Sequence, residues 1–243
     1  MFGIFKKNKS VTTEQLTTDI HSHLIPGVDD GVKSFEESIS LIQKFHDAGY
    51  KKLITTPHIM HDFYNNTESH LRSIHRDLVS KLAEKQINIQ IDIAAEYYLD
   101  DHLMSRIENK EEDFLTFGEN YILFETSFMN QPFQLAEFIF KAKSRGLKPV
   151  LAHPERYMYL INDDRLLQDL VDREVYFQLN LNSLSGYYSK QVQKFARRLI
   201  DEKLIHFLGS DCHNDIHFEN ILLSREMKYY QKALELPLLN KTL

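Results

Sequence analysis

Histidine, aspartate and glutamate residues recur at the ends of short apolar segments in this sequence. His21 and His23 are two residues apart in DIHSH, and Asp211 and His213 repeat that spacing in GSDCH. Neutral imidazoles and carboxylates are typical ligands of divalent metal ions. The nine candidate ligands are His21, His23, Asp30, His58, Glu96, Glu125, His153, Asp211 and His213. This number predicts a cluster of metal ions, and clustered metals with open positions activate water for attack on phosphorus.

The two-residue spacing of both pairs has a geometric reason. Alternate side chains of a β-strand point to the same face, so His21 and His23 can chelate one ion without a bend in the backbone. Asp211 and His213 have the same relation, and Cys212 between them is expected to point away and pack. A lone pair of this kind also fits solvated or core histidines. The two pairs and the four further strand-end candidates together favour metal binding.

For other residues near these segments, both a functional role and an ordinary structural role fit the sequence. Glu96 and Glu125 each follow a segment predicted to be a buried strand, where a carboxylate is unfavourable unless it is paired or binds metal. Either residue taken singly also fits a surface glutamate. His153 precedes a proline, which predicts an extended backbone. Arg156 is expected either to bind two phosphate oxygens through its guanidinium or to form a surface ion pair with Glu155.

Seven short apolar segments alternate with longer segments of helical periodicity, which predicts parallel βα units. Ser34 and Glu37 form a capping-box pattern for a helix that ends at Gly49. Further helices are expected over 67–85, 130–146 (capped by Asn130), 187–202 and 218–234. The expected strands are 18–23, 52–56, 89–96, 121–125, 149–153, 175–181 and 205–210.

Seven such units predict an α/β fold, a distorted TIM-like (β/α)7 barrel. We expect a single domain over residues 17–243 after a flexible leader, residues 1–16. In such barrels the chemistry lies at the carboxyl ends of the strands, and six of the seven expected strands end at or near a candidate ligand. The leader contains Phe2, Ile4, Phe5 and three lysines. It predicts a disordered solubilising tail, with contact to a membrane surface or a partner as the alternative.

Composition excludes several classes of protein. The 243 residues include 42% hydrophobic side chains, enough for a sizeable core, and a formal net charge of −6 does not favour nucleic-acid binding. The single cysteine, Cys212, excludes an intramolecular disulfide and fits a cytoplasmic location. We expect no signal peptide and no membrane-spanning helix. A cysteine phosphatase is disfavoured because the sixth residue after Cys212 is Phe218 rather than arginine, and no nucleotide-binding or GxSxG motif occurs.

With these residues assembled, the sequence resembles the PHP (polymerase and histidinol phosphatase) family. Within it, the chain is similar to the bacterial capsule-type protein tyrosine phosphatases. The matching segments, which extend from Asp19 to Asn214, are DIHSHLIPGVDDG, LITTPHIM, IAAEYYLD, YILFETS, LAHPERY and GSDCHN. The resemblance implies a distorted seven-stranded barrel with three divalent metal ions. Manganese is expected first, with iron, zinc or magnesium as alternatives.

The resemblance also implies roles for individual residues. The nine candidates would be the ligands, with Asp30 chosen over Asp29, which spacing alone does not separate. Arg156 would bind the phosphoryl group. The substrate would be phosphotyrosine in a protein, such as the tail of a bacterial tyrosine kinase that controls capsule or exopolysaccharide synthesis. The oligomeric state is left open.

One segment departs from the family pattern. Relatives place a further arginine shortly after the DxHN motif, whereas here Asn214 is followed by DIHFENILLSR, with His217 nearby and no arginine before Arg225. The second phosphate contact and the preferred substrate are therefore open questions. His61, close to His58, is a further candidate for substrate contact or proton donation.

Three other functions compete with a protein phosphatase. A small-molecule phosphoesterase such as histidinol phosphatase would use the same metals behind a different rim. A metal-binding regulatory protein would keep the ligands without activity. An amide hydrolase of the HxH barrel group ranks last, because it commonly uses a modified lysine where this chain has glutamates. Three aromatic pairs either flank a substrate ring or simply pack: Phe63/Tyr64, Tyr97/Tyr98 and Tyr187/Tyr188.

Overall fold

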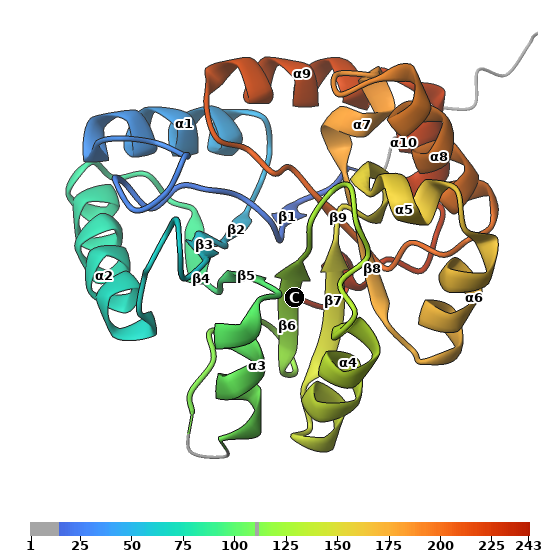
Figure 1. Ribbon diagram of the computed structural model, residues 1–243. Coiled ribbons are helices and arrows are strands. Elements are labelled where there is room, and N and C mark those ends of the chain that lie inside the picture. Colours follow the sequence, from blue (N-terminus) through green and yellow to red (C-terminus); the bar gives the residue numbers. More distant parts are fainter. Residues whose placement is uncertain (1–14, 110–111) are drawn as a thin grey trace, which may run out of the picture.

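The computed structural model describes residues 15–109 and 112–243. Parallel strands form a strongly curled sheet, and the helices surround it (Figure 1). The strands pair in the orders β1-β2-β4 and β3-β5-β6-β7-β8-β9. Their bounds are β1 Thr18–Asp19, β2 Lys52–Thr55, β3 His58–Ile59, β4 Gln90–Ile93, β5 Glu96–Tyr98, β6 Tyr121–Glu125, β7 Lys148–Ala152, β8 Tyr176–Asn180 and β9 Phe207–Gly209. The parallel α/β architecture expected from the sequence is thus confirmed at this level.

Two of the expected strands are interrupted. In the segment 18–23 only β1 forms before a break, and in the segment 89–96 β4 ends at Ile93 before β5 begins at Glu96. The segment 52–56 forms β2 as expected, and β3 begins beyond it at His58. Beyond β1, Ser22 forms a parallel bridge with Cys212. The His23 amide donates to the Cys212 carbonyl at 2.9 Å, so the first and last strand segments lie side by side.

Ten α-helices are found in the described residues. They are α1 Phe35–Asp47, α2 Glu68–Glu84, α3 Asp101–Glu108, α4 Leu135–Ser144, α5 Met158–Ile161, α6 Asp164–Asp172, α7 Leu181–Ser185, α8 Lys190–Asp201, α9 Asp215–Arg225 and α10 Lys228–Leu234. Short 3-10 helices cover Pro154–Arg156 and Leu239–Thr242. The Ser34 side chain accepts the Glu37 amide as expected, but the Glu37 carboxylate accepts the Lys33 amide, so only half of a capping box forms.

Two expected helix boundaries are wrong. Asn130 does not begin a helix: its amide donates to the Ser127 hydroxyl at 3.4 Å, and α4 starts only at Leu135. The segment 218–234 is two helices rather than one, and the first begins at Asp215 because the Asn214 side chain accepts the His217 amide. Met227, which has an extended backbone, separates the two helices, and no glycine or proline in the sequence indicates the break.

Two apolar clusters hold the sheet and helices together. The larger cluster packs the helices against the outer face, and a smaller one includes Ile54, Leu123, Val150 and Phe207 from the strands. Alternate strand residues share a face, so Leu123 lies on the same face as Glu125, two residues further along β6. The smaller cluster therefore forms a floor beneath the carboxyl end of the sheet.

The predicted leader is only partly covered by the structure. Residues 1–14, with Phe2, Ile4 and Phe5, lie outside the described residues. Leu16 is buried, and its amide donates to the Tyr230 hydroxyl at 3.2 Å. None of the helices in the described part of the chain combines the length and apolar character needed to cross a membrane.

Candidate metal centre

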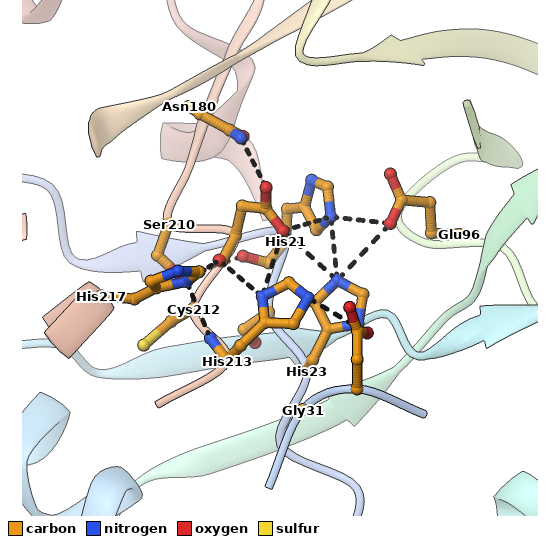
Figure 2. A network of polar contacts seen from close by, with 12 residues as sticks. His21, His23, Gly31, Glu96, Asn180, Ser210, Cys212, His213 and His217 are labelled. Carbon is orange, nitrogen blue, oxygen red and sulfur yellow. Dashed lines mark hydrogen bonds and ion pairs between the residues drawn. The ribbon is translucent and has the colours of Figure 1, made fainter. Parts of the chain in front are cut away.

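The nine candidate ligands lie together at the carboxyl end of the sheet, on strands or in the loops that follow them. Figure 2 shows His21, His23, Glu96 and His213 pointing toward one another from three segments of the chain, with Asn180 and His217 beside them. The candidate ligand atoms form four overlapping groups, each with all its atoms within 4.8 Å of one another. The groups are His23/Asp30/His58/His213, His21/His23/Glu96, His21/His153/Asp211 and His58/Glu96/Glu125.

Glu96 occupies the middle of this arrangement. Its Oε2 atom is 3.2 Å from both His21 Nε2 and His58 Nδ1, and its Oε1 atom is 3.0 Å from His153 Nε2. His58 Nδ1 is also 3.1 Å from Glu125 Oε1. His23 Nε2 lies 3.5 Å from the same Glu96 Oε2 atom, so one buried carboxylate faces four imidazoles from three different parts of the chain.

Asp211 joins the imidazoles to a second set of polar groups. Its Oδ1 atom is 3.5 Å from His21 Nε2 and 3.4 Å from His23 Nε2. Its Oδ2 atom accepts hydrogen bonds from Arg156 Nη1 at 3.0 Å and from Asn180 Nδ2 at 2.6 Å. One carboxylate therefore faces the histidines on one side and the arginine on the other.

The two neighbouring aspartates, Asp29 and Asp30, have different partners in the structure. Asp30 Oδ1 lies 3.5 Å from His58 Nε2 and 3.4 Å from His213 Nε2. Asp29 instead accepts a hydrogen bond from His23 Nδ1 at 2.8 Å and one from the His58 amide at 3.0 Å. Asp30 thus lies among the candidate ligands, whereas Asp29 orients a histidine from behind.

The hydrogen bonds of the histidines fit bound metal. His21 Nδ1 donates to Gln178 Oε1 at 2.7 Å, and His213 Nδ1 donates to the Asp211 carbonyl at 2.9 Å. With the bond from His23 to Asp29, three imidazoles are fixed through Nδ1 and turn Nε2 toward the cluster, as metal-binding histidines do. His58 Nδ1 is buried without a hydrogen bond although two carboxylate oxygens lie close to it. A divalent cation would satisfy these converging lone pairs.

Burial and charge act together on the acidity of this cluster. Burial alone would raise the pKa of Glu96, but the charges of His21 and His58 hold it well below its usual value. Burial would lower the pKa of His58, but Glu96 and Glu125 raise it to about 9. The carboxylates therefore hold protons on the imidazoles, and a bound cation must displace these protons.

Two candidate ligands have unusual backbone geometry. His153 has φ 33° and Asp211 has φ 50°, both in the left-handed region that non-glycine residues rarely occupy. The extended backbone expected for His153 before proline is therefore wrong. Tertiary contacts override the local preference: its amide donates to Gln178 Oε1, and its carbonyl accepts the Arg156 amide. Such strain concentrates at functional sites.

Arg156 lies beside the cluster rather than in a surface ion pair. Its guanidinium is 4.4 Å from the ring centroid of Phe128 and 4.3 Å from that of Tyr188. Glu155, the alternative partner, is buried and accepts hydrogen bonds from the Asn180 amide and the Ser183 hydroxyl. The two rings hold the guanidinium plane, so its edge is available to an anion.

A cavity of about 700 Å³ opens over the candidate ligands. Arg156, Tyr188, Asn214 and His217 line it together with six apolar or aromatic residues: Met60, Phe63, Tyr64, Tyr98, Phe128 and Met129. Arg225 packs on Tyr50 and donates to the Ala48 carbonyl instead, so the described residues supply no second arginine here.

The structure decides between alternatives that the sequence left open for His61 and Tyr97, and it adds residues that the sequence did not indicate. His61 stacks on His102 and is not among the described residues that line the cavity. Tyr97 is buried in the core. Gln178 and Asn180 were missed, although their two-residue spacing on β8 matches that of the histidine pairs. This strand carries no candidate ligand and instead orients ligands from other strand segments, His21 after β1 and Asp211 after β9.

The fold and the site together define a class. The chain is an α/β protein with a curled, TIM-like parallel sheet that gathers imidazoles and carboxylates at its carboxyl end. A phosphotriesterase homology protein from Escherichia coli shares this fold at 12% identity with a TM-score of 0.51, covering 91% of this chain and 93% of the other.

The chain belongs to the family described as capsular polysaccharide synthesis, CpsB/CapC, which matches residues 17–234. It is 30% identical over 201 residues to the tyrosine-protein phosphatase CpsB of Streptococcus pneumoniae, covering 81% of this chain and 82% of that protein. It is 29% identical over 197 residues to the tyrosine-protein phosphatase YwqE of Bacillus subtilis (81% and 77% covered). A solved structure from work on YwqE and CpsB, described as unique metal-dependent tyrosine phosphatases, matches with a TM-score of 0.77 and 28% identity over 86% of each chain.

Proposed function

We propose that this protein is a metal-dependent phosphatase that hydrolyses phosphotyrosine in proteins. The observation that carries the proposal is the convergence of the nine candidate ligands, Glu96 among them, with Arg156 anchored beside them on Asp211. The names of its relatives, tyrosine-protein phosphatases, agree with this function. Bound divalent metals would supply an activated water nucleophile and would stabilise charge on the phosphoryl group.

The nine candidate residues would hold three divalent ions. Manganese is our first choice, with iron, zinc or magnesium as alternatives, because oxygen and imidazole ligands accept several of these ions. The four overlapping ligand groups support more than one ion. Asp29, Gln178 and the Asp211 carbonyl would keep His23, His21 and His213 oriented through their Nδ1 atoms.

Side chains of the protein itself would contribute the rest of the catalytic chemistry. Arg156, whose Nη1 atom is bound to Asp211, would present its free edge to the phosphoryl oxygens and stabilise their growing charge. The leaving phenol has a pKa near 10, so its departure needs less help from an acid than that of an alkyl alcohol. No covalent enzyme intermediate is required.

The physiological setting is part of the same proposal. The substrate would be the tyrosine-rich tail of a bacterial kinase that controls capsule or exopolysaccharide synthesis, and the protein would act in the cytoplasm. Residues 17–243 would form one domain. For the fold, the bridge between Ser22 and Cys212 supports a distorted (β/α)7 barrel, because it joins the two ends of the strand order.

The test is turnover of a phosphotyrosine peptide by purified protein before and after chelation, with metal analysis of the same sample. We expect turnover that chelation removes and manganese restores. Faster turnover of histidinol phosphate would show a metabolite phosphatase instead. Failure of the reconstituted protein to hydrolyse any phosphomonoester would overturn the proposal and favour a regulatory role.

A further inference from the structure

The mouth of the cavity has two chemically different sides. Arg156, Tyr188, Asn214 and His217, which lie after β7, β8 and β9, supply most of the polar rim. The side contributed by β3, β5 and β6 and by the loops after them is mostly aromatic or thioether: Met60, Phe63, Tyr64, Tyr98, Phe128 and Met129. Because β3, β5 and β6 are neighbours in the sheet, these residues form one continuous wall.

This wall is poorly explained by packing within the chain. Phe63 is 73% exposed and Met129 is 66% exposed, although both are large apolar side chains. Phe128, also partly exposed, lines the same cavity. Exposed apolar side chains gathered at the mouth of a cavity mark a binding surface for an apolar group.

The wall is continuous with the groups that would bind phosphate. The Tyr64 ring lies nearly parallel to the His58 imidazole, with centroids 5.4 Å apart and an interplanar angle of 12°. The Phe128 ring contacts Arg156 on one side and lies 5.7 Å from His153. A phosphate ester held between the candidate ligands and Arg156 therefore has the wall within reach of its ester group.

The charge distribution then fixes which end of a substrate goes where. An anionic phosphoryl group is attracted by Arg156 and by cations in the metal centre, whereas the wall offers π-faces and a polarisable sulfur. Aromatic rings gain from stacking and edge-to-face contacts, and thioethers contact ring edges favourably. An alkyl ester gains less from the same surface because it has less apolar area and no π-system.

We propose that Phe63, Tyr98 and Met129 form a subsite for the aromatic ring of the leaving group and determine the preference for aryl over alkyl phosphates. The inference rests on the proposed phosphatase function and adds the residues that select the substrate. The polar side of the mouth would hold the anion, and the apolar wall would discriminate between esters.

The test compares binding of phenylphosphonate and methylphosphonate, two stable analogues, to the metal-loaded protein by isothermal titration calorimetry. We expect the wild-type protein to bind phenylphosphonate about tenfold more tightly, in line with the contribution of one aromatic contact. In the double variant Phe63→Ala/Met129→Ala the ratio should fall toward one, with methylphosphonate binding unchanged. Both side chains are largely exposed, so the variant should fold, and circular dichroism checks this.

Phe140 provides a matched control. It is 69% exposed on α4 and is not among the described residues that line the cavity. Phe140→Ala should keep the wild-type ratio. An unchanged ratio in the double variant, or an equal fall in Phe140→Ala, would overturn the subsite.

Turnover separates this inference from the function on which it rests. If the wild-type protein hydrolyses phosphotyrosine peptide but shows no preference for phenylphosphonate, the subsite is wrong and the phosphatase function is kept. If the ring preference depends on Phe63 and Met129 but no phosphomonoester is hydrolysed, the phosphatase function is wrong and the aromatic subsite is kept.

Discussion

The two ends of the sheet are formed by the same strands but bury different kinds of side chain. At the carboxyl end, Glu96 and Asp211 are buried among imidazoles. At the amino end, Tyr121 and Phe207 pack edge-to-face with centroids 5.1 Å apart, and Tyr176 packs edge-to-face on Tyr121 at the same distance. The carboxyl end of the sheet buries charged groups, whereas the amino end buries aromatic rings.

This difference indicates that the amino end mainly stabilises the fold, whereas the carboxyl end holds charged groups that depend on that stability. Buried charges are unfavourable unless each has partners, and removal of one partner leaves the others uncompensated. Buried aromatic rings contribute through their area and through their ring geometry. The left-handed backbone at His153 and Asp211 adds strain at the carboxyl end. The aromatic end should therefore be sensitive mainly to loss of side-chain volume, and the carboxyl end mainly to loss of charge.

The largest effect is expected from Glu96→Gln at the carboxyl end. The amide keeps the volume but removes the charge that faces His21, His58 and His153. We expect kcat/KM for a phosphotyrosine peptide to fall by about a thousandfold or more, since several kcal/mol of electrostatic stabilisation would be lost. Bound metal per protein, measured by elemental analysis, should fall as well, while the circular dichroism spectrum stays unchanged.

Glu119→Gln is the matched control for this variant. Glu119 is exposed at the other end of the sheet, where it pairs with Lys148 at 2.9 Å. Its loss should leave turnover and metal content within about twofold of the wild type, as expected for a surface ion pair. Turnover by Glu96→Gln above a tenth of the wild-type value would contradict the central role of Glu96.

Phe207→Ala tests the opposite end. Phe207 is fully buried against Phe117, Tyr121 and Tyr176, so the change leaves a cavity. We expect the free energy of unfolding to fall by about 3–5 kcal/mol in urea denaturation. The fraction that remains folded should keep its metal content and its kcat, because no ligand moves. A variant of normal stability with impaired turnover would reverse the division between the two ends.

The sequence predicted the parallel α/β fold and the positions of the candidate ligands near strand ends, because both follow from local periodicity. It did not predict the roles of Asp29 or Gln178, because a hydrogen bond to a histidine from another segment leaves no local pattern. The backbone of His153 was predicted wrongly for the same reason: the proline rule is local, and contacts with Gln178 and the Arg156 amide override it.

Helix boundaries failed where tertiary contacts replaced local signals. Asn130 has the chemistry of a helix cap, yet the structure uses it in a turn with Ser127. The break between α9 and α10 at Met227 falls in a sequence without glycine or proline. Without such a residue to mark the break, the sequence predicted a single helix.

The pH dependence of the metal-free protein gives the last and smallest test of the comparison. The His58 pKa of about 9 exceeds the unfolded value of about 6.5, so its contribution to stability is fully present below pH 6.5 and is lost as the pH rises through about 9. Burial opposes this shift, but the charges of Glu96 and Glu125 outweigh it. We expect the free energy of unfolding of chelated protein to fall by roughly 3 kcal/mol between pH 6 and pH 9.5.

Bound metal should remove this dependence. Since a cation must displace the proton from His58, its affinity should rise with pH over the same interval, so that the metal-loaded protein keeps its stability where the chelated protein loses it. Urea denaturation at both pH values, with and without manganese, measures the two slopes. His58→Ala should reduce the slope of the chelated protein, although His21 and His23, for which burial is again outweighed by nearby carboxylates that raise their pKa values, still contribute to it. Phe207→Ala should lower its stability equally at both pH values. Parallel slopes for chelated and metal-loaded protein would show that the imidazoles do not exchange protons for metal.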